Sequence, residues 1–305
     1  MRFSIFQESR KGGRNANEDR TSYAYTREAL LMVVADGMGG HLHGEVASQI
    51  AVQLLTEAFQ REAKPMLADP SGFLQESILE AHSALGDYAA ARNLIESPRT
   101  TCVACVVQDA TAWWAHAGDS RLYHVREGRI QAQTRDHSRV QMLVDQGRVR
   151  EEAVAAHPDR NKIFNCIGAS ARPQVELSRA TPLRRDDTLI LCTDGLWGPL
   201  TGRLITAALM KSDIMNAVPG LLDLAELRAG ADCDNLSVVA MTWAGTRSRT
   251  AAGEVSTQTL VLDGVSTQLG DFSKADHGDL SDEEIERAIQ EIRAAIRKHT
   301  PQKKP

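Results

Sequence analysis

Four strand-length apolar runs each meet an aspartate flanked by glycine, serine or asparagine, and this pattern constrains the fold most strongly. The aspartates are Asp36 in VVADGMGG, Asp119 in WAHAGDSR, Asp194 in LILCTDGLW and Asp234 in DCDNLSVV. Short apolar runs bounded by turn residues are typical of buried strands, so we expect each carboxylate at a strand end, with its backbone in a turn. Acids that cluster in a partly dry cleft repel one another, and oxygen-only ligands favour magnesium or manganese over zinc. The sequence therefore predicts a carboxylate-rich metal site.

The order of strand and helix patterns predicts an α+β fold. Strands are predicted at residues 2–9, 20–26, 29–35, 101–108, 112–117, 121–126, 129–133, 174–179, 188–192 and 236–243. Helices are predicted from residue 44 and at residues 73–94, 199–211 and 214–229. Because the strands come in blocks and the helices in sequential pairs, antiparallel sheets are favoured over a doubly wound parallel sheet.

The composition changes after Trp243, which divides the chain into three predicted parts. Residues 1–244 form the folded domain, and residues 245–280, rich in Ser, Thr, Gly, Gln and Asp, are typical of a flexible linker with a short strand at 257–262. Residues 281–300 begin with the capping box SDEE and carry isoleucines at helical spacing. This amphipathic helix cannot bury its narrow apolar stripe alone, so we expect it to pack on the core or to bind a partner such as a regulator.

Charge and hydropathy exclude several classes of protein. The net charge of −5 argues against a general nucleic-acid binder. No apolar stretch approaches the roughly 20 residues of a membrane span, and the N-terminus lacks the pattern of a secretory signal. The five cysteines lie mostly in apolar runs and do not suggest a disulfide framework. We therefore expect a protein of the reducing cytoplasm that binds neither nucleic acid nor membrane.

Two loops offer further polar groups, and each has a structural alternative. In GRNANEDR, Arg14, Glu18 and Asp19 form either a local salt-bridged loop or a site in which the acids join the metal cluster and Arg14 binds phosphate. After Asp36, three glycines in four positions let the backbone pass close to a ligand, and Gly37 can turn its carbonyl toward a cation. His41 follows, and a histidine beside a metal cluster can carry protons. Asp119, Asp194 and Asp234 can each serve a turn instead.

The motifs taken together resemble a known family. RNANED, VVADGMGGHLHGEVAS, AGDSRLY, TRDHS, HPDRNK, LCTDGLW and DNLSVV follow one another between residues 10 and 239. In this order they resemble the metal-dependent protein serine/threonine phosphatases of type 2C, in their bacterial form. The resemblance implies a four-layer α-β-β-α sandwich, in which two antiparallel sheets pack face to face with helix pairs outside and a metal cleft at one edge.

The resemblance also implies roles for the site residues. Asp36 would bridge two Mn²⁺ or Mg²⁺ ions, with the Gly37 carbonyl on one of them. Asp194 and Asp234 would complete one coordination shell, and the acidic loop of Glu18 and Asp19 would serve the other, mainly through water. Asp119, with Asp194, would hold a weaker third metal, and Arg14 would bind the substrate phosphate. Residues 137–168 would form a flap over the cleft.

Two positions depart from the pattern of the family. Met38 stands where eukaryotic members typically have a histidine that can act as general acid, so protonation of the leaving group would fall to metal-bound water, to His41 or to another group. Gly198 stands where many relatives have a further acid, which bears on the affinity for a third metal. Neither departure removes one of the implied metal ligands.

The resemblance implies hydrolysis of phosphoserine and phosphothreonine on proteins, opposing a bacterial serine/threonine kinase. A hydroxide that bridges the two metals would attack in line, and the metals with Arg14 would offset phosphoryl charge. Two alternatives stay open. One is a catalytically silent module that acts through its C-terminal helix, and the other is a phosphatase for a small phosphoester or a nucleotide.

Overall fold

The protein is described by a computed structural model over residues 1–38, 43–150, 153–154, 157–160, 162–245 and 266–269. The strands are β1 (Arg2–Arg10), β2 (Asp19–Tyr25), β3 (Ala29–Met38), β4 (Arg99–Thr100), β5 (Cys102–Gln108), β6 (Thr111–Ala117), β7 (Arg121–Arg126), β8 (Arg129–Gln133), β9 (Glu176–Leu177), β10 (Thr181–Pro182), β11 (Thr188–Cys192), β12 (Leu236–Gly245) and β13 (Ser266–Leu269). The α-helices are α1 (Gly44–Glu62), α2 (Pro70–Ala91), α3 (Arg139–Asp145), α4 (Asp194–Trp197), α5 (Gly202–Lys211) and α6 (Ile214–Ala229).

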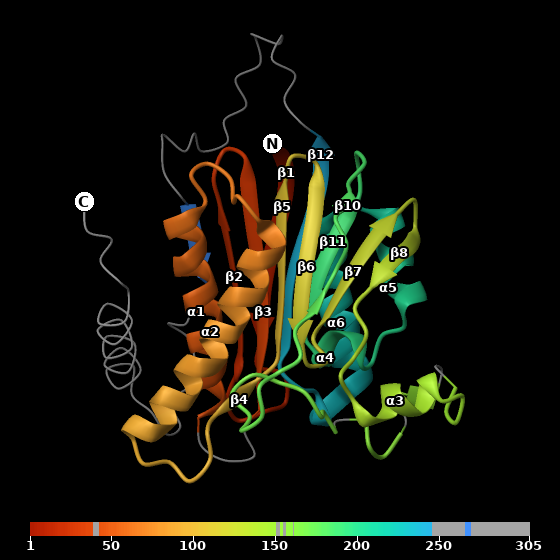
Figure 1. The fold of residues 1–305 in the computed structure, drawn as a ribbon. Coiled ribbons are helices and arrows are strands. Elements are labelled where there is room, and N and C mark those ends of the chain that lie inside the picture. The colour runs from red at the N-terminus through yellow and green to blue at the C-terminus, as the bar shows by residue number, and fades with distance from the viewer. Residues whose placement is uncertain (39–42, 151–152, 155–156, 161, 246–265, 270–305) are drawn as a thin grey trace, which may run out of the picture.

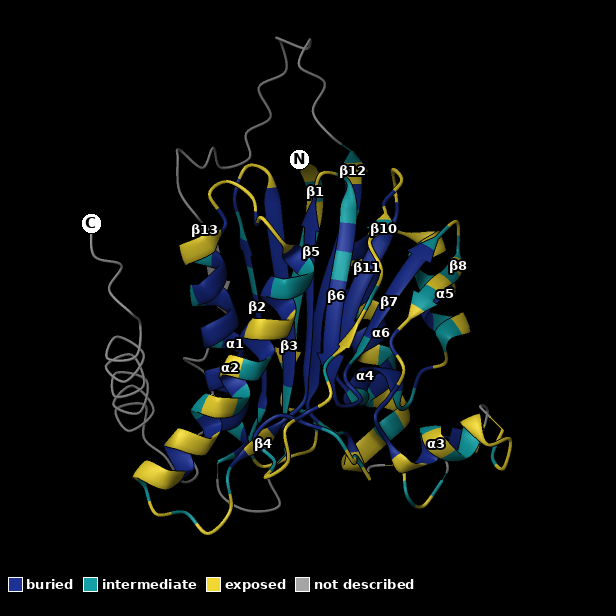
Figure 2. Ribbon diagram, viewed as in Figure 1, coloured by how far each residue is buried: buried dark blue, intermediate teal, exposed yellow. Residues whose placement is uncertain are grey.

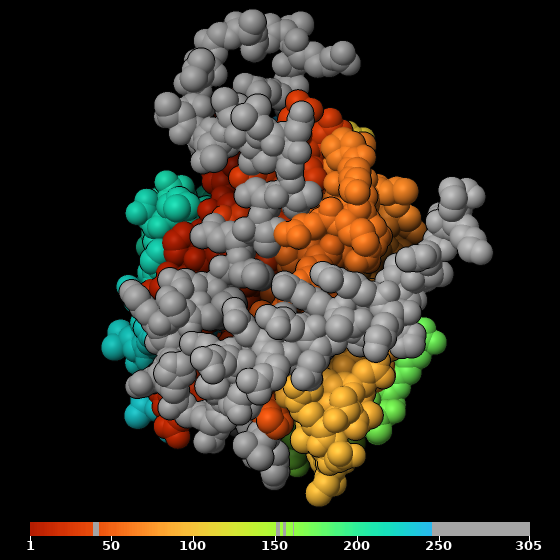
Figure 3. Space-filling view, turned by 90° about the vertical axis from the view of Figure 1, so that its left-hand side faces the viewer, coloured from red at the N-terminus to blue at the C-terminus, as the bar shows by residue number. Residues whose placement is uncertain are grey.

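The strands form two antiparallel sheets between two helical layers (Figure 1). One sheet has the order β1-β12-β11-β7-β8, and the other has the order β10-β6-β5-β3-β2-β13 with β4 and β9 attached. Helices α1 and α2 cover the outer face of the larger sheet, and in Figure 3 they form the orange surface on the right. Helices α5 and α6 cover the smaller sheet. The predicted α+β sandwich with helix pairs outside is confirmed.

The alternation of side chains along buried strands explains the layers. In β3, Leu30, Met32 and Val34 face the second sheet, whereas Leu31 and Val33 face the helices. Such a strand buries both faces, which accounts for its continuous apolar sequence. Figure 2 shows the central strands almost wholly buried, with exposed residues on the outer sides of the helices.

Several boundaries differ from the sequence prediction for local reasons. Helix α2 begins at Pro70 because the Asp69 carboxylate accepts hydrogen bonds from the amides of Ser71 (3.1 Å) and Gly72 (3.0 Å). The expected strand at 174–179 is reduced to β9, which pairs only with His116 and Ala115 of β6. Strand β3 continues past its predicted end to Met38 because β4 pairs with it.

Parts of the C-terminal prediction lie outside the described residues, namely the short strand at 257–262 and the helix at 281–300. Within the segment expected to be a linker, the structure describes β13, which pairs antiparallel with β2 at the edge of the larger sheet. No helix among the described residues is both long enough and apolar enough to span a bilayer.

Candidate metal centre

Five aspartates converge at one end of the two sheets. Asp19 opens β2 and lies directly opposite Asp36 of β3. Asp119 lies between β6 and β7, Asp194 begins α4 after β11, and Asp234 precedes β12. The carboxylate of Asp36 is close enough to the other four for each to raise its pKa. The structure therefore brings together the four aspartates that end apolar runs and the Asp19 of the first loop.

The expectation that these aspartates have their backbones in turns is wrong for two of them. Asp36 lies within β3, because the following Gly37 and Met38 pair with Thr100 and Arg99 of β4. Asp194 is the first residue of a helix, since the amide of Gly198 donates to its carbonyl at 2.7 Å. In both cases regular hydrogen bonding, and not a turn, fixes the direction of the carboxylate.

A short chain of hydrogen bonds, hereafter the relay, holds the main chain of Asp36. Its carbonyl accepts from the Thr101 amide (2.9 Å) and from the Thr100 hydroxyl (2.7 Å), and its amide donates to Thr101 Oγ1 at 3.0 Å. Thr101 Oγ1 in turn lies 2.7 Å from Ser120 Oγ, next to Asp119. The relay ties two site acids from different strands into one unit. Sequence reasoning missed all three of these polar residues. Ser120 carried a signal because it directly follows Asp119, whereas Thr100 and Thr101 are next to no acid in the sequence.

Burial and repulsion among the carboxylates outweigh the nearby arginines in the electrostatics of the site. The structure describes no ion pair to Asp36, Asp119 or Asp194, and Asp19 is only 2% exposed. Burial, followed by the nearby Asp194, raises the pKa of Asp19 to about 7. Burial, followed by Asp234, raises the pKa of Asp194 to about 6. Burial is also the main cause that holds the pKa of Asp36 and of Asp119 well above the usual range.

Asp19 carries an oxygen without a partner. Its Oδ2 accepts from the Thr193 hydroxyl at 2.8 Å, but its Oδ1 is buried with no hydrogen-bond partner in the part of the chain that the structure describes. Buried polar atoms are nearly always satisfied, so an exception calls for a missing ligand. A set of donors made only of carboxylate and carbonyl oxygens suits magnesium or manganese. The residues present therefore fit a hard divalent cation.

Gly37 fits this site for a steric reason. A Cβ at this position would lie 2.2 Å from the Gly44 carbonyl oxygen and 2.7 Å from that of Glu18. Any larger residue would push α1 and the Glu18 loop away from β3. Gly37 thus allows the start of α1, the first loop and Asp36 to meet.

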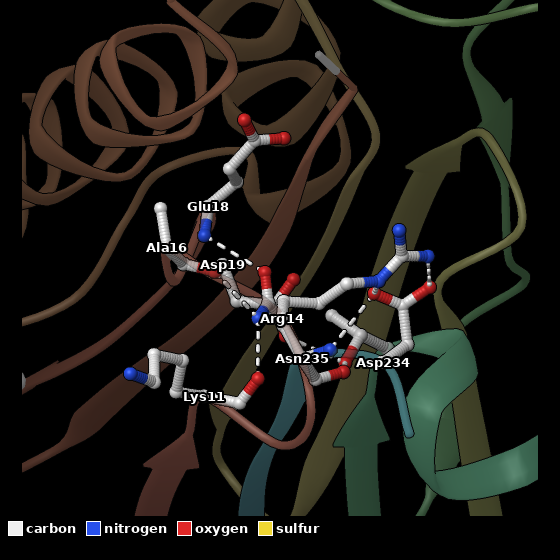
Figure 4. Close-up of polar contacts among 8 residues, drawn as sticks. Lys11, Arg14, Ala16, Glu18, Asp19, Asp234 and Asn235 are labelled. Carbon is white, nitrogen blue, oxygen red and sulfur yellow. Dashed lines mark hydrogen bonds and ion pairs between the residues drawn. The ribbon is translucent and has the colours of Figure 1, made fainter. Parts of the chain in front are cut away.

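Arg14 lies at the cluster, where it is bound to Asp234 (Figure 4). Its Nε donates to Oδ1 at 2.8 Å and its Nη2 to Oδ2 at 2.6 Å, a two-point contact that raises the pKa of the guanidinium. The side chain of Arg14 is still 55% exposed. The Glu18 carboxylate points away from this pair in Figure 4, so the first loop presents Arg14 and Glu18 in different directions. His41 lies outside the described residues.

Asn235 organises the first loop and was missed by the sequence analysis. Its Oδ1 accepts from the Glu18 amide at 2.9 Å, and its Nδ2 donates to the carbonyls of Lys11 (2.8 Å) and Ala16 (2.9 Å). Its own amide donates to Asp234 Oδ1 at 2.9 Å. One buried amide thereby fixes the loop that carries Arg14 beside Asp234. The signal was present as the amide that follows the acid in DNLSVV.

Comparison with solved structures places this fold in a class. The Staphylococcus aureus serine/threonine phosphatase Stp1 matches with a TM-score of 0.72 and 30% identity, covering 80% of this chain and 96% of that one. The catalytic domain of the serine/threonine phosphatase PstP, crystallised with two manganese ions, matches with a TM-score of 0.67 and 31% identity over 80% of this chain and 99% of that one. The structure thus has the fold of the bacterial serine/threonine phosphatases.

Sequence comparison names the family. The sequence profile described as protein phosphatase 2C matches residues 8–212. PstP of Mycobacterium tuberculosis is 33% identical over 232 residues, which are 76% of this chain and 43% of that protein. The chain therefore belongs to the protein phosphatase 2C family, and its match spans less than half of the mycobacterial relative.

Proposed function

We propose that this chain is a metal-dependent phosphatase that hydrolyses phosphoserine and phosphothreonine on proteins. The observation that carries the proposal is the convergence of five aspartates at one sheet end. The pKa values of Asp19, Asp36, Asp119 and Asp194 are raised, and the last three have no ion pair among the described residues. Membership in the protein phosphatase 2C family supports it.

The oxygen donor set favours Mn²⁺ or Mg²⁺ as the cofactor, and the PstP domain crystallised with two manganese ions supports a binuclear centre. Asp36 would hold both ions, and the Gly37 carbonyl would hold one of them. Asp194 and Asp234 would complete the ligands of one ion, and the loop of Glu18 and Asp19 would serve the other. Asp119 would serve a weaker third ion. Two such ions, when bound, activate a water for in-line attack on phosphorus.

Arg14 would bind the phosphate through the fork that now contacts Asp234. A phosphate offers the same two-point acceptor geometry as a carboxylate, so the guanidinium can exchange one for the other without changing its own shape. The exchange would free Asp234 Oδ2 for a cation, while Oδ1 would keep its hydrogen bond from the Asn235 amide. Arg14 would then offset charge on the phosphoryl oxygens during the reaction.

We propose phosphorylated proteins as substrates and a bacterial serine/threonine kinase as the opposing enzyme, as the phosphatase names of the relatives suggest. We also propose the reducing cytoplasm as the location, in keeping with five cysteines that are all buried and unpaired. The C-terminal helix would dock on the core or on a regulator. Deletion of residues 246–305 that changes neither activity, nor stability, nor partner capture would remove that role.

The decisive test is manganese-dependent hydrolysis of a phosphothreonine peptide. Asp36→Asn and Asp194→Asn keep side-chain volume but remove a charged ligand, and we expect both to lose nearly all turnover. Asp186→Asn is the matched control because its side chain is 81% exposed, and it should keep full activity. Turnover retained in either site variant would refute the assigned roles.

The same assay separates the alternative functions. A silent binding module would show no manganese-dependent turnover in the wild-type chain. A phosphatase for small esters would hydrolyse an aryl phosphate or a nucleotide much faster than the peptide. We expect the phosphopeptide to be preferred and EDTA to abolish the reaction.

A further inference from the structure

His137 makes two hydrogen bonds with Gly118, the residue that precedes Asp119: one through its imidazole and one through its backbone amide. The Gly118 amide donates to His137 Nδ1 at 3.2 Å, and the His137 amide donates to the Gly118 carbonyl at 3.0 Å. The His137 side chain is 9% exposed. The position of Asp119 therefore depends directly on where this ring lies.

The same ring binds residues of the segment 164–176. Asn165 Nδ2 lies 2.6 Å from His137 Nδ1, and the orientation of this amide is fixed by Gln174: Nδ2 donates to the Gln174 carbonyl (2.8 Å), and Oδ1 accepts from the Gln174 amide (3.0 Å). Because Nδ1 faces two N–H donors, the ring proton belongs on Nε2, 3.3 Å from Glu176 Oε2. One neutral tautomer thus satisfies groups on both sides of the ring.

The surroundings of the ring favour this neutral form. Burial, followed by the neighbouring His116, lowers the pKa of His137. The two imidazoles stack with centroids 4.6 Å apart and planes 14° from parallel. The Nε2 atom of His116 donates to the Arg135 carbonyl at 2.7 Å, and this bond holds the His116 ring in place against His137. A charged His137 would need a proton on Nδ1, directly facing the Gly118 amide.

A metal site at His116, His137 and Glu176 fits the geometry less well. Their ligand atoms lie within 4.8 Å of one another, and His116 Nδ1 is buried without a partner among the described residues. However, the stacked rings are nearly parallel, so their in-plane lone pairs do not converge on one point. The Nδ1 atom of His137 is already used by two donors, and its Nε2 carries the proton. The cluster is therefore better explained as a set of hydrogen-bonded side chains that hold the His137 ring in place than as a metal site.

A second set of contacts holds Asp119 from the other side. Trp197 Nε1 donates to the Asp119 carbonyl at 3.0 Å, and the Arg121 guanidinium lies 3.6 Å above the Trp197 ring. Arg121 also makes a two-point ion pair with Asp136, at 2.8 and 2.7 Å. Asp136 and His137 are consecutive in sequence. His137 contacts Gly118 before Asp119, and Asp136 holds Arg121 after it.

We propose that His137 is a positioning residue that couples the segment 164–176 to Asp119, so that the packing of this segment and the placement of a metal-site carboxylate are set together. The proposal rests on the proposed function. Displacing the ring would loosen Asp119 at its Gly118 amide and free Asn165 and Glu176 on the segment. Weaker metal binding and faster hydrogen exchange in the segment 164–176 should then appear together.

The test uses a series of variants at this one position. His137→Leu removes every side-chain hydrogen bond at similar volume. His137→Asn places Oδ1 where Nδ1 now accepts, so the bond from the Gly118 amide is kept. Supporting polar contacts of metal ligands are typically worth 10–100-fold in affinity. We expect His137→Leu to weaken manganese binding at the weaker site, to which Asp119 is assigned, roughly tenfold, and His137→Asn to remain within about twofold of wild type there.

Binding and dynamics are measured without turnover. Calorimetric titration with Mn²⁺ gives the affinity, and amide hydrogen exchange reports on residues 164–176 and on Gly118 to Ser120. His137→Leu should speed exchange in both segments, and His137→Asn should restore slow exchange at Gly118 to Ser120. His124→Leu is the matched control because His124 is 2% exposed and bonded to Asp187, at the other end of β11. That control should leave both segments unchanged.

Two results would overturn the proposal. One is a His137→Leu variant with wild-type manganese affinity and wild-type exchange. The other is a His137→Asn variant as impaired as His137→Leu, since the acceptor at Nδ1 would then be irrelevant. A wild-type chain that binds manganese but hydrolyses no phosphopeptide would refute the proposed function alone, because affinity and exchange would still test the role of His137.

Discussion

The two ends of β11 carry carboxylates in opposite electrostatic states, fully buried at Asp187 and half-buried at Asp194. Before the strand, Asp187 is fully buried, yet it accepts from Arg126 Nε (2.7 Å) and Nη2 (2.6 Å), from the Arg184 amide (2.8 Å) and lies 3.0 Å from His124 Nε2. Burial acts to raise its pKa, but the bonds from Arg126 and the others outweigh it, and the pKa is lowered. After the strand, burial leaves the pKa of Asp194 raised to about 6.

This difference shows how a structural carboxylate is told from a ligand carboxylate. Both ends bury acids, so burial alone does not identify the site. At the Asp187 end the protein itself supplies the balancing groups. The Arg126 guanidinium neutralises the carboxylate, and the Arg184 amide donates a further hydrogen bond. At the Asp194 end the backbone is well bonded, but the ion pair from Arg14 goes to Asp234. Asp36, Asp119 and Asp194 have no ion pair among the described residues, which is costly unless a cation from solution binds.

The largest expected effect on stability comes from removing the Asp187 carboxylate, which pairs with Arg126 before β11. Asp187→Ala leaves Arg126 without its buried partner, and removing one member of such a pair typically costs about 3–5 kcal/mol. We expect a decrease of this size in the free energy of unfolding, measured by urea denaturation with manganese present. Activity per folded molecule should stay unchanged. A loss below about 1 kcal/mol would show that the Asp187 network contributes little.

Manganese bound at the aspartate cluster after β11 should stabilise the folded protein by somewhat less than the Asp187 network does. An ion that binds only the folded state contributes about 2.7 kcal/mol at a concentration of one hundred times its Kd. We expect the thermal midpoint of EDTA-treated protein to rise on addition of Mn²⁺, and the rise to shrink strongly in Asp36→Asn. Asp187→Asn serves as the comparison, because it should lower the midpoint but keep the manganese response. An equal response in Asp36→Asn would remove this residue from the metal site.

The sequence was sufficient to predict the acids but not how they are held. Asp36, Asp119, Asp194 and Asp234 end apolar runs, and their convergence follows from antiparallel strands that end at the same edge. The layered fold followed from the blocks of strands and pairs of helices. These features are local in sequence, and therefore periodicity and turn residues are enough to predict them.

The supporting contacts join residues that are distant in sequence, and no local pattern encodes them. Asn235 bonds to Lys11 and Ala16 across more than two hundred residues. The pairing of β4 with β3, which keeps Asp36 within a strand, likewise depends on a two-residue strand too short to carry a pattern. Arg14 was expected to face a phosphate, and its contact with Asp234 could not be read from either motif.

The pH dependence of the metal-free protein should reflect the unpaired acids. The folded pKa values of Asp19 and Asp194, about 7 and about 6, lie above the unfolded value near 4. Their contribution to stability is thus fully present below about pH 4 and is lost as the pH rises through about 6 to 7. Saturating manganese should remove this part of the dependence, because the ion compensates the charges. Thermal midpoints between pH 5 and 8, with and without manganese, give the difference; identical profiles would contradict the assignment.

Asp19→Asn should give the smallest effect, with a sign opposite to that of Asp187→Asn. The amide keeps an acceptor for the Thr193 hydroxyl and removes the charge on a carboxylate that is buried beside Asp194 and Asp234. We expect the metal-free protein to gain on the order of 1 kcal/mol at pH 7.5, the equivalent of about one pKa unit, while its response to manganese falls. Asp187→Asn under the same conditions should lose stability. If Asp19→Asn is also destabilising without metal, then the Asp19 carboxylate is a structural group like Asp187, and the two ends of β11 differ less than their electrostatics indicate.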